Sequence, residues 1–128
     1  MGNTHFHIIK AKRNEEFYES YNLDKSQFNE WAIVVLFYAS MHYVDAVLYQ
    51  DTSLPQEMRN PIDHKKRDIA IARCSKLDPI APIYKNLRDR CREARYYKIC
   101  FPNDYLGKFV TRLFKPTKDY LRKSLGLT

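Results

Sequence analysis

The sequence predicts an all-α protein, in which residues 1–128 form a single domain built as an antiparallel, up-and-down bundle of four to five helices. Three observations indicate this fold class. Apolar residues recur at helical spacing along most of the chain. No segment alternates apolar and polar residues between turn residues, as strands do. The candidate helices are joined by short connections, which make neighbouring helices antiparallel.

The segment 31–49 is the most hydrophobic part of the chain and is the predicted central helix. Every residue in 31–39 is apolar or aromatic, and a helix that is apolar on all sides packs at the centre of a fold. We expect this helix to begin at a cap, either Asp24 or Ser26, and to end near Gln50.

Four polar side chains of the central helix are spaced 4, 3 and 4 residues apart, so they form one stripe, the polar stripe, made of Tyr38, His42, Asp45 and Tyr49. Buried polar groups need partners. We expect the polar stripe to face either the start of the next helix or the same stripe of a second subunit. Two roles stay open: His42 and Asp45 orient one another as a base and its carboxylate, or the stripe is a buried network that fixes helix register or a dimer interface.

The other helices follow from caps, prolines and apolar spacing. A first amphipathic helix covers 5–22. A third begins with Asn60 as its N-cap and Pro61 at its first position, and ends before Asp78. A fourth covers 82–100, and a fifth is capped by Asn103. Pro116 either kinks that helix or separates a sixth one over 117–125.

Charge is divided unevenly along the chain. Residues 1–51 hold 4 basic and 7 acidic side chains, and residues 52–128 hold 18 and 8. A basic half favours an acidic partner such as nucleic acid, with a solvated surface as the alternative. The three cysteines have neither disulfide nor zinc spacing, which is typical of a cytoplasmic protein. His42 and Asp45 argue against a membrane-spanning central helix.

The segment 59–64 carries the strongest chemical pattern. With a helix starting here, the free backbone N–H groups form an anion site. Arg59 can bind phosphate, and His64 can transfer a proton near neutral pH. Lys65, Lys66 and Arg67 follow directly and extend the basic surface. A capped, solvent-facing helix start is the alternative.

A second basic surface lies on the fourth helix, where Arg88, Arg92 and Arg95 form a stripe beside Tyr96. Arginines hold phosphates and aromatic rings stack on bases, so this pattern favours single-stranded RNA. We expect no metal site and no cofactor, since His5 and His7 are a lone pair without a carboxylate or cysteine at ligand spacing.

The segment Arg59-Asn60-Pro61-Ile62-Asp63-His64 has the form of the RNxxxH motif of the HEPN superfamily, and the chain resembles small prokaryotic HEPN-like proteins over most of its length. The resemblance implies a helical bundle, a homodimer and metal-independent endoribonuclease activity. It implies that Arg59 stabilises the phosphate charge, that His64 is the general acid or base, and that Asn60 orients one of them. It also allows a non-catalytic interaction module, the partner of a nucleotidyltransferase or an antitoxin.

Overall fold

The computed structural model describes residues 3–21, 28–98 and 100–127. Within these ranges the chain is helical and contains no strand, so the predicted all-α class is confirmed. The elements in chain order are α1 (Thr4–Glu19), α2 (Asn29–Gln50), the 3₁₀ turn η2 (Gln56–Met58), α3 (His64–Arg73), the 3₁₀ turn η3 (Ser75–Leu77), α4 (Ala81–Tyr96), α5 (Asn103–Phe109), the π-helical segment η4 (Val110–Phe114) and α6 (Lys115–Ser124).

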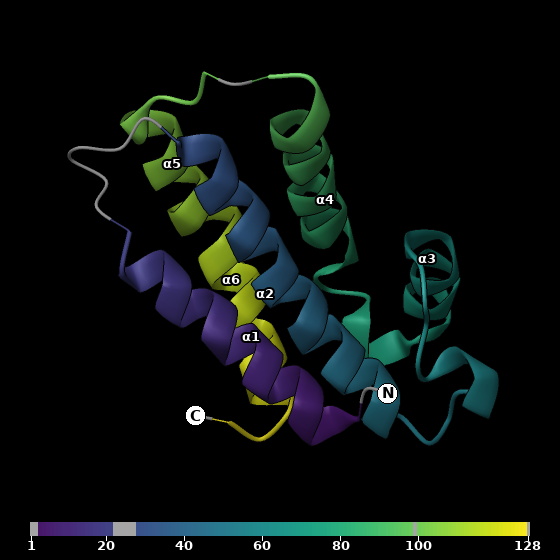
Figure 1. Cartoon of the computed structure of the whole chain (residues 1–128). Coiled ribbons are helices and arrows are strands. Elements are labelled where there is room, and N and C mark those ends of the chain that lie inside the picture. The colour runs from purple at the N-terminus through teal and green to yellow at the C-terminus, as the bar shows by residue number, and fades with distance from the viewer. Residues whose placement is uncertain (1–2, 22–27, 99, 128) are drawn as a thin grey trace.

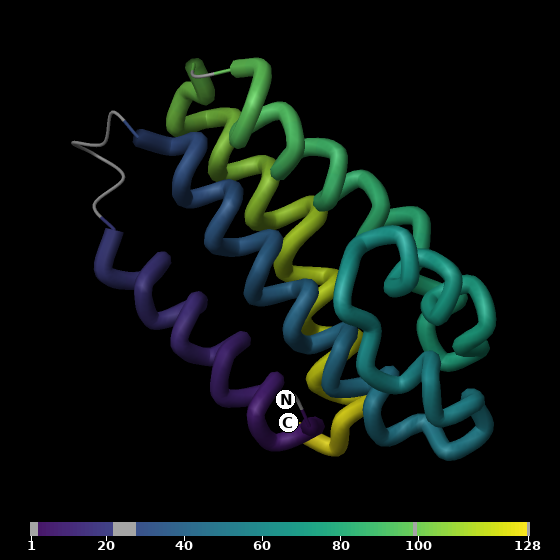
Figure 2. The backbone as a smooth tube through the Cα atoms, turned by 45° about the vertical axis from the view of Figure 1, so that its right-hand side comes forward, coloured from purple at the N-terminus to yellow at the C-terminus, as the bar shows by residue number. Residues whose placement is uncertain are grey.

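Four rods run alternately up and down (Figure 1). They are α1, α2, α4 and the C-terminal rod, which we define as residues 103–124 and which comprises α5, η4 and α6. The short helix α3 is inserted between α2 and α4 and packs beside the bundle. In Figure 2, α2 lies between α1 on one side and the C-terminal rod on the other.

The central position predicted for the hydrophobic segment is confirmed. Of the 22 residues of α2, 15 are buried, and Phe37, Tyr43 and Leu48 are at most 1% exposed. This helix is long and apolar enough to cross a membrane, yet 78% of its most apolar stretch is buried by the other helices, as in the core helix of a globular protein. The caps proposed at Asp24 and Ser26 lie outside the described residues, and α2 begins at Asn29.

The start of α3 differs from the prediction. Asn60 is not its N-cap: Asp63 occupies that position, and its carboxylate accepts a hydrogen bond from the Lys66 backbone N–H at 2.8 Å. Both residue types cap helices well, but Asp63 has the extended backbone of an N-cap (φ −147°, ψ 170°) and its carbonyl accepts the first helical bond, from Arg67, at 3.0 Å. His64 is therefore the first residue of α3.

Pro116 lies at the start of a separate α-helix, α6, which is one of the two predicted alternatives, although this helix begins at Lys115 and not at residue 117. The five residues Val110–Phe114 form a π-helical segment, and α6 continues from it directly. Proline has no N–H and clashes with the preceding turn of an α-helix, and a wider turn relieves both problems. The Thr117 hydroxyl donates to the Leu113 carbonyl at 2.8 Å and satisfies an acceptor near this turn.

Candidate functional site

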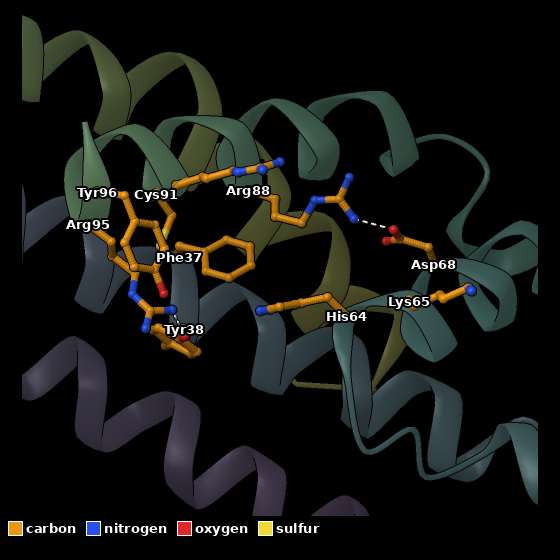
Figure 3. Close-up of a pocket in the computed structure, with 10 residues that line it drawn as sticks. Phe37, Tyr38, His64, Lys65, Asp68, Arg88, Cys91, Arg95 and Tyr96 are labelled. Atoms are coloured by element: carbon orange, nitrogen blue, oxygen red, sulfur yellow. Dashed lines mark hydrogen bonds and ion pairs between the residues drawn. The ribbon is translucent and has the colours of Figure 1, made fainter. Parts of the chain in front are cut away.

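A pocket of about 410 Å³ opens between α2, α3 and α4 (Figure 3). We call it the α2–α3–α4 pocket. Its volume lies within the range of small-ligand sites. Helix α2 supplies its inner wall, and α3 and α4 supply the two sides. It is lined by Phe37, Tyr38, His64, Lys65, Asp68, Arg88, Cys91, Arg92, Arg95 and Tyr96.

The charge of the pocket is strongly positive. Four of its side chains are Lys or Arg, and the one carboxylate among its lining residues is Asp68. Asp68 forms an ion pair with Arg88 across the gap between α3 and α4, as Figure 3 shows. The lining side chains therefore carry a net charge of three positive units. Arg92 is exposed on the rim of the pocket. Such a pocket attracts anions.

An arginine lies between two tyrosine rings at one end of the pocket. The Arg95 guanidinium donates a hydrogen bond to the Tyr38 hydroxyl at 2.7 Å. It also lies 4.9 Å from the centre of the Tyr96 ring and 5.9 Å from that of Tyr38. Cation–π contacts and the hydrogen bond hold this side chain in place. Tyr38 of the polar stripe thus has its partner on α4.

His64 lies at the other end of the pocket, with its ring centre 6.0 Å from that of Phe37. Burial lowers the pKa of His64, and the cations Arg67, Arg88 and Arg95 lower it further. Its imidazole is therefore neutral at pH 7 and can accept a proton.

Arg67 was expected on a nucleic-acid surface, and this expectation is wrong. Its side chain is buried and forms two bonds with Asp45: Nε to Oδ1 at 2.7 Å and Nη2 to Oδ2 at 3.0 Å. Its Nη1 lies 3.4 Å from His64 Nδ1. Arginine suits this role because its planar guanidinium matches a carboxylate. The pair connects the polar stripe to the start of α3, as one of the two predicted arrangements required.

His42 and Asp45 do not orient one another as base and carboxylate. Asp45 bonds Arg67, whereas Nδ1 of His42 lies 3.0 Å from Nδ1 of His7 on α1. The two imidazole rings are stacked, with centres 5.2 Å apart. The observed network ties α1 and α3 to α2 through His42 and Asp45, but of the polar stripe only Asp45 is buried, and Tyr49 is exposed.

The two ends of the RNxxxH segment line different pockets. Arg59 donates from Nε to the Leu54 carbonyl at 3.1 Å and from Nη2 to the Thr52 carbonyl at 3.4 Å, so it holds the loop after α2. With Asn60 and Tyr49, Arg59 lines a separate pocket, and His64 is not among its lining residues. Within one chain, Arg59 and His64 therefore do not meet in one pocket.

Most of the predicted RNA-binding residues do come together. The α2–α3–α4 pocket is lined by Lys65, Arg88, Arg92, Arg95 and Tyr96 of the predicted RNA-binding set. His64, a predicted catalytic residue, and Tyr38 of the polar stripe line it as well. Lys66 is exposed on α3 but is not among the residues that line the pocket.

Sequence reasoning missed Phe37, Asp68 and Cys91 as pocket residues, and it missed His7 as a partner of the polar stripe. Burial raises the pKa of the Cys91 thiol to about 12, so it is protonated at neutral pH and is not a ready nucleophile. His5 and His7 are two residues apart and suggest a pair in the sequence, but on α1 His7 is buried and His5 is exposed. Asp68 stands four residues after His64 and therefore on the same face of α3.

A scan against protein-family models, a search of curated proteins and a search of solved structures each find no match to this chain.

Proposed function

We propose that the protein binds a nucleotide, free or as a residue of single-stranded RNA, in the α2–α3–α4 pocket. The observation that carries this proposal is the convergence of four Lys and Arg side chains with two tyrosines on one pocket of about 410 Å³. Phosphate requires the cations, and a base requires a flat apolar surface. The cations come from both walls of the pocket, with Lys65 on α3 and Arg92 on α4.

In this proposal, one end of the pocket binds the phosphate and the other end binds the base. Arg88 and Lys65 lie on the side of Asp68, where a phosphate would compete with that carboxylate for the Arg88 guanidinium. Tyr96 is 64% exposed and supports Arg95, so its ring offers the free surface on which a base stacks. This division predicts that phosphorylated ligands bind more tightly than nucleosides.

The direct test is titration of the protein with short single-stranded RNA and with mononucleotides, followed by fluorescence anisotropy or calorimetry. Arg92→Gln removes one rim cation and should weaken binding several-fold and reduce its salt dependence. Arg73→Gln is the matched control, since Arg73 is exposed on α3 and is not among the pocket's lining residues. Equal effects of the two substitutions would assign the affinity to general charge, and the proposal would fail.

RNA cleavage is the activity that this pocket would support. His64 is neutral and could accept the proton of a ribose 2′-hydroxyl, whose oxygen then attacks the adjacent phosphorus. The P–O5′ bond breaks, which leaves a 2′,3′-cyclic phosphate and a 5′-oxygen that takes a proton from water. Arg88 and Arg95 would stabilise the charge on the phosphate. This assignment replaces Arg59 with arginines of α4. A cleavage assay in EDTA tests it: His64→Ala should remove cleavage while RNA binding persists, and Arg59→Gln should leave cleavage in place if the fold is intact. Loss of cleavage with Arg59→Gln would instead favour a site completed by a second subunit.

The second candidate is an interaction module, and an exposed apolar face favours it. A groove of about 330 Å³ between α1 and α2 has only apolar exposed surface, and its members Phe17 and Trp31 are 58% and 55% exposed. Contiguous apolar surface of this kind marks protein contacts. The groove is lined by Phe17, Tyr18, Tyr21, Phe28, Trp31, Ala32 and Val35.

We propose a second copy of the chain as the occupant of this groove, in keeping with the homodimer that the resemblance to HEPN-like proteins implies. Light scattering during size exclusion measures the mass in solution. Trp31→Ala should shift a dimer toward monomer, whereas Tyr97→Ala, an exposed aromatic at the end of α4, should not. A monomeric wild-type protein would reject the homodimer and leave the groove to a different protein, such as the nucleotidyltransferase or antitoxin considered above.

A further inference from the structure

Three potential metal ligands from two helices meet beside the ion pair of Asp45 and Arg67. A ring nitrogen of His7, a ring nitrogen of His42 and a carboxylate oxygen of Asp45 all lie within 4.8 Å of one another. His7 comes from α1, and the other two lie three residues apart on α2. The Nδ1 atoms of the two histidines are 3.0 Å apart.

The arrangement leaves one buried polar atom unexplained. His7 is 6% exposed, and its Nε2 makes no hydrogen bond. A buried donor without a partner costs free energy, so the position of His7 calls for a compensating interaction. The Asn60 side chain lies near enough to the His7 ring to raise its pKa as a hydrogen-bond partner does.

We propose that His7, His42 and Asp45 bind a divalent transition-metal ion, with zinc as the best match to two imidazoles and one carboxylate. Zinc accepts this ligand set and completes its tetrahedron with a water molecule or a substrate atom. The site is independent of the nucleotide proposal, since none of its three ligands is among the lining residues of the α2–α3–α4 pocket.

The distances agree with such a site. Zinc–nitrogen bonds of roughly 2.0–2.1 Å in a tetrahedron place two ligand nitrogens roughly 3.4 Å apart. The two Nδ1 atoms are a few tenths of an ångström closer than this, so they have to move apart only slightly to admit the ion. The Asp45 oxygen lies no more than 4.8 Å from the histidine nitrogens, so the three ligands have to close by roughly 1.4 Å at most to reach the spacing of a zinc site.

The surrounding groups are those that support metal ligands. Metal-bound histidines usually donate their second N–H to a carbonyl or carboxylate, and ligating carboxylates are themselves hydrogen-bonded. Arg67 fixes both oxygens of Asp45, and each oxygen keeps a further lone pair for an ion.

The test uses the full chain, stripped with EDTA and then titrated with zinc in a calorimeter and with cobalt in a spectrophotometer. The expected result is one zinc per chain, a rise in Tm on zinc addition, and the visible absorption of a four-coordinate cobalt site. His42→Gln should weaken zinc binding by more than about 100-fold. The control is His5→Gln, which removes an exposed histidine two residues from His7 and should leave binding unchanged.

Two results would overturn the proposal. One is the absence of stoichiometric zinc binding by the wild-type protein, and the other is an equal loss of binding in His5→Gln and His42→Gln. Circular dichroism shows whether His42→Gln is folded. If it is not, NMR of the wild-type protein decides instead: zinc should shift the ring resonances of two of the four histidines, and shifts confined to an exposed histidine would reject the site.

Discussion

Arg67 of α3 and Asp45 of α2 face each other as a two-bond ion pair with side chains 7% and 3% exposed. The pair is 22 residues apart in sequence and connects the inserted helix α3 to the central helix. Because α3 also supplies His64, Lys65 and Asp68, the same pair fixes one wall of the α2–α3–α4 pocket.

Removal of one partner of this pair should be strongly destabilising. Arg67→Met leaves the Asp45 carboxylate buried without its cation, which costs about 3–5 kcal/mol of unfolding free energy. Urea denaturation followed by circular dichroism measures the loss. Asp68→Asn breaks the exposed pair with Arg88 and is the control, with an expected loss below about 1 kcal/mol. Losses of similar size in the two variants would contradict a structural role for the buried pair.

Mild acid should destabilise the metal-free protein. Burial and the neighbouring His7 lower the pKa of His42 from 6.5 to about 4, and the pKa values of His7 and His64 are lowered as well. The unfolded chain therefore binds more protons than the folded chain once the pH falls below 6.5. The free energy of unfolding is highest above that pH. It declines as the pH falls, until the histidines of the folded protein also protonate, which for His42 occurs near pH 4.

For His42 the decline should reach roughly 1–2 kcal/mol after allowance for the partial exposure of its ring. Urea titrations in EDTA at about pH 7.5, 6 and 5 measure it. His42→Gln should reduce the dependence on pH, and His5→Gln should preserve it. Stability that is constant from about pH 7.5 to 5 would show that these histidines protonate freely in the folded protein.

The three cysteines should differ sharply in reactivity. Cys74 and Cys91 are 0% and 2% exposed, and burial raises their pKa values to about 11 and about 12, whereas Cys100 is exposed. The thiolate is the reactive form. A chromogenic disulfide reagent should therefore modify one thiol in the native protein and three in denaturant. Cys100→Ser should remove the rapid native reaction, and its persistence would show that the interior opens readily.

Substitution of Asp63 tests whether its side-chain oxygen caps α3. Asp63→Ala removes the 2.8 Å hydrogen bond to the Lys66 N–H and should cost about 1 kcal/mol of unfolding free energy. Asp63→Asn keeps an acceptor oxygen and should retain most of the stability, which makes it the matched control. Equal stability of the alanine variant and the wild-type protein would place the effective cap elsewhere.

The fold class followed from the sequence because helix periodicity and burial are local signals. The hydrophobic run of α2 identifies the core helix, and the basic stripe of α4 identifies residues that the structure brings into one pocket. These predictions depend on spacing within a helix, which is independent of how the helices are arranged.

The partners of the polar stripe could not be derived in this way. His7 and Arg67 reach α2 from elements 35 and 22 residues away in sequence, and helical spacing carries no information on which rods become neighbours. The boundary of α3 was misplaced for a different reason. Asn60 and Asp63 are nearly equivalent as caps, so the choice between them depends on the backbone path between η2 and α3.

The π-helical segment has a geometric consequence for the C-terminal rod. Core residues before it are Leu106 and Phe109, Phe114 is its last residue, and Thr117 and Leu121 follow it, so one step of five residues interrupts the usual steps of three and four. An additional residue rotates the second half of a helix by about 100°. Lys118, which follows this turn on α6, pairs with Glu15 of α1 at 2.5 Å. The wide turn thus changes the helical phase along the rod, and the two segments, α5 and α6, both pack against α2.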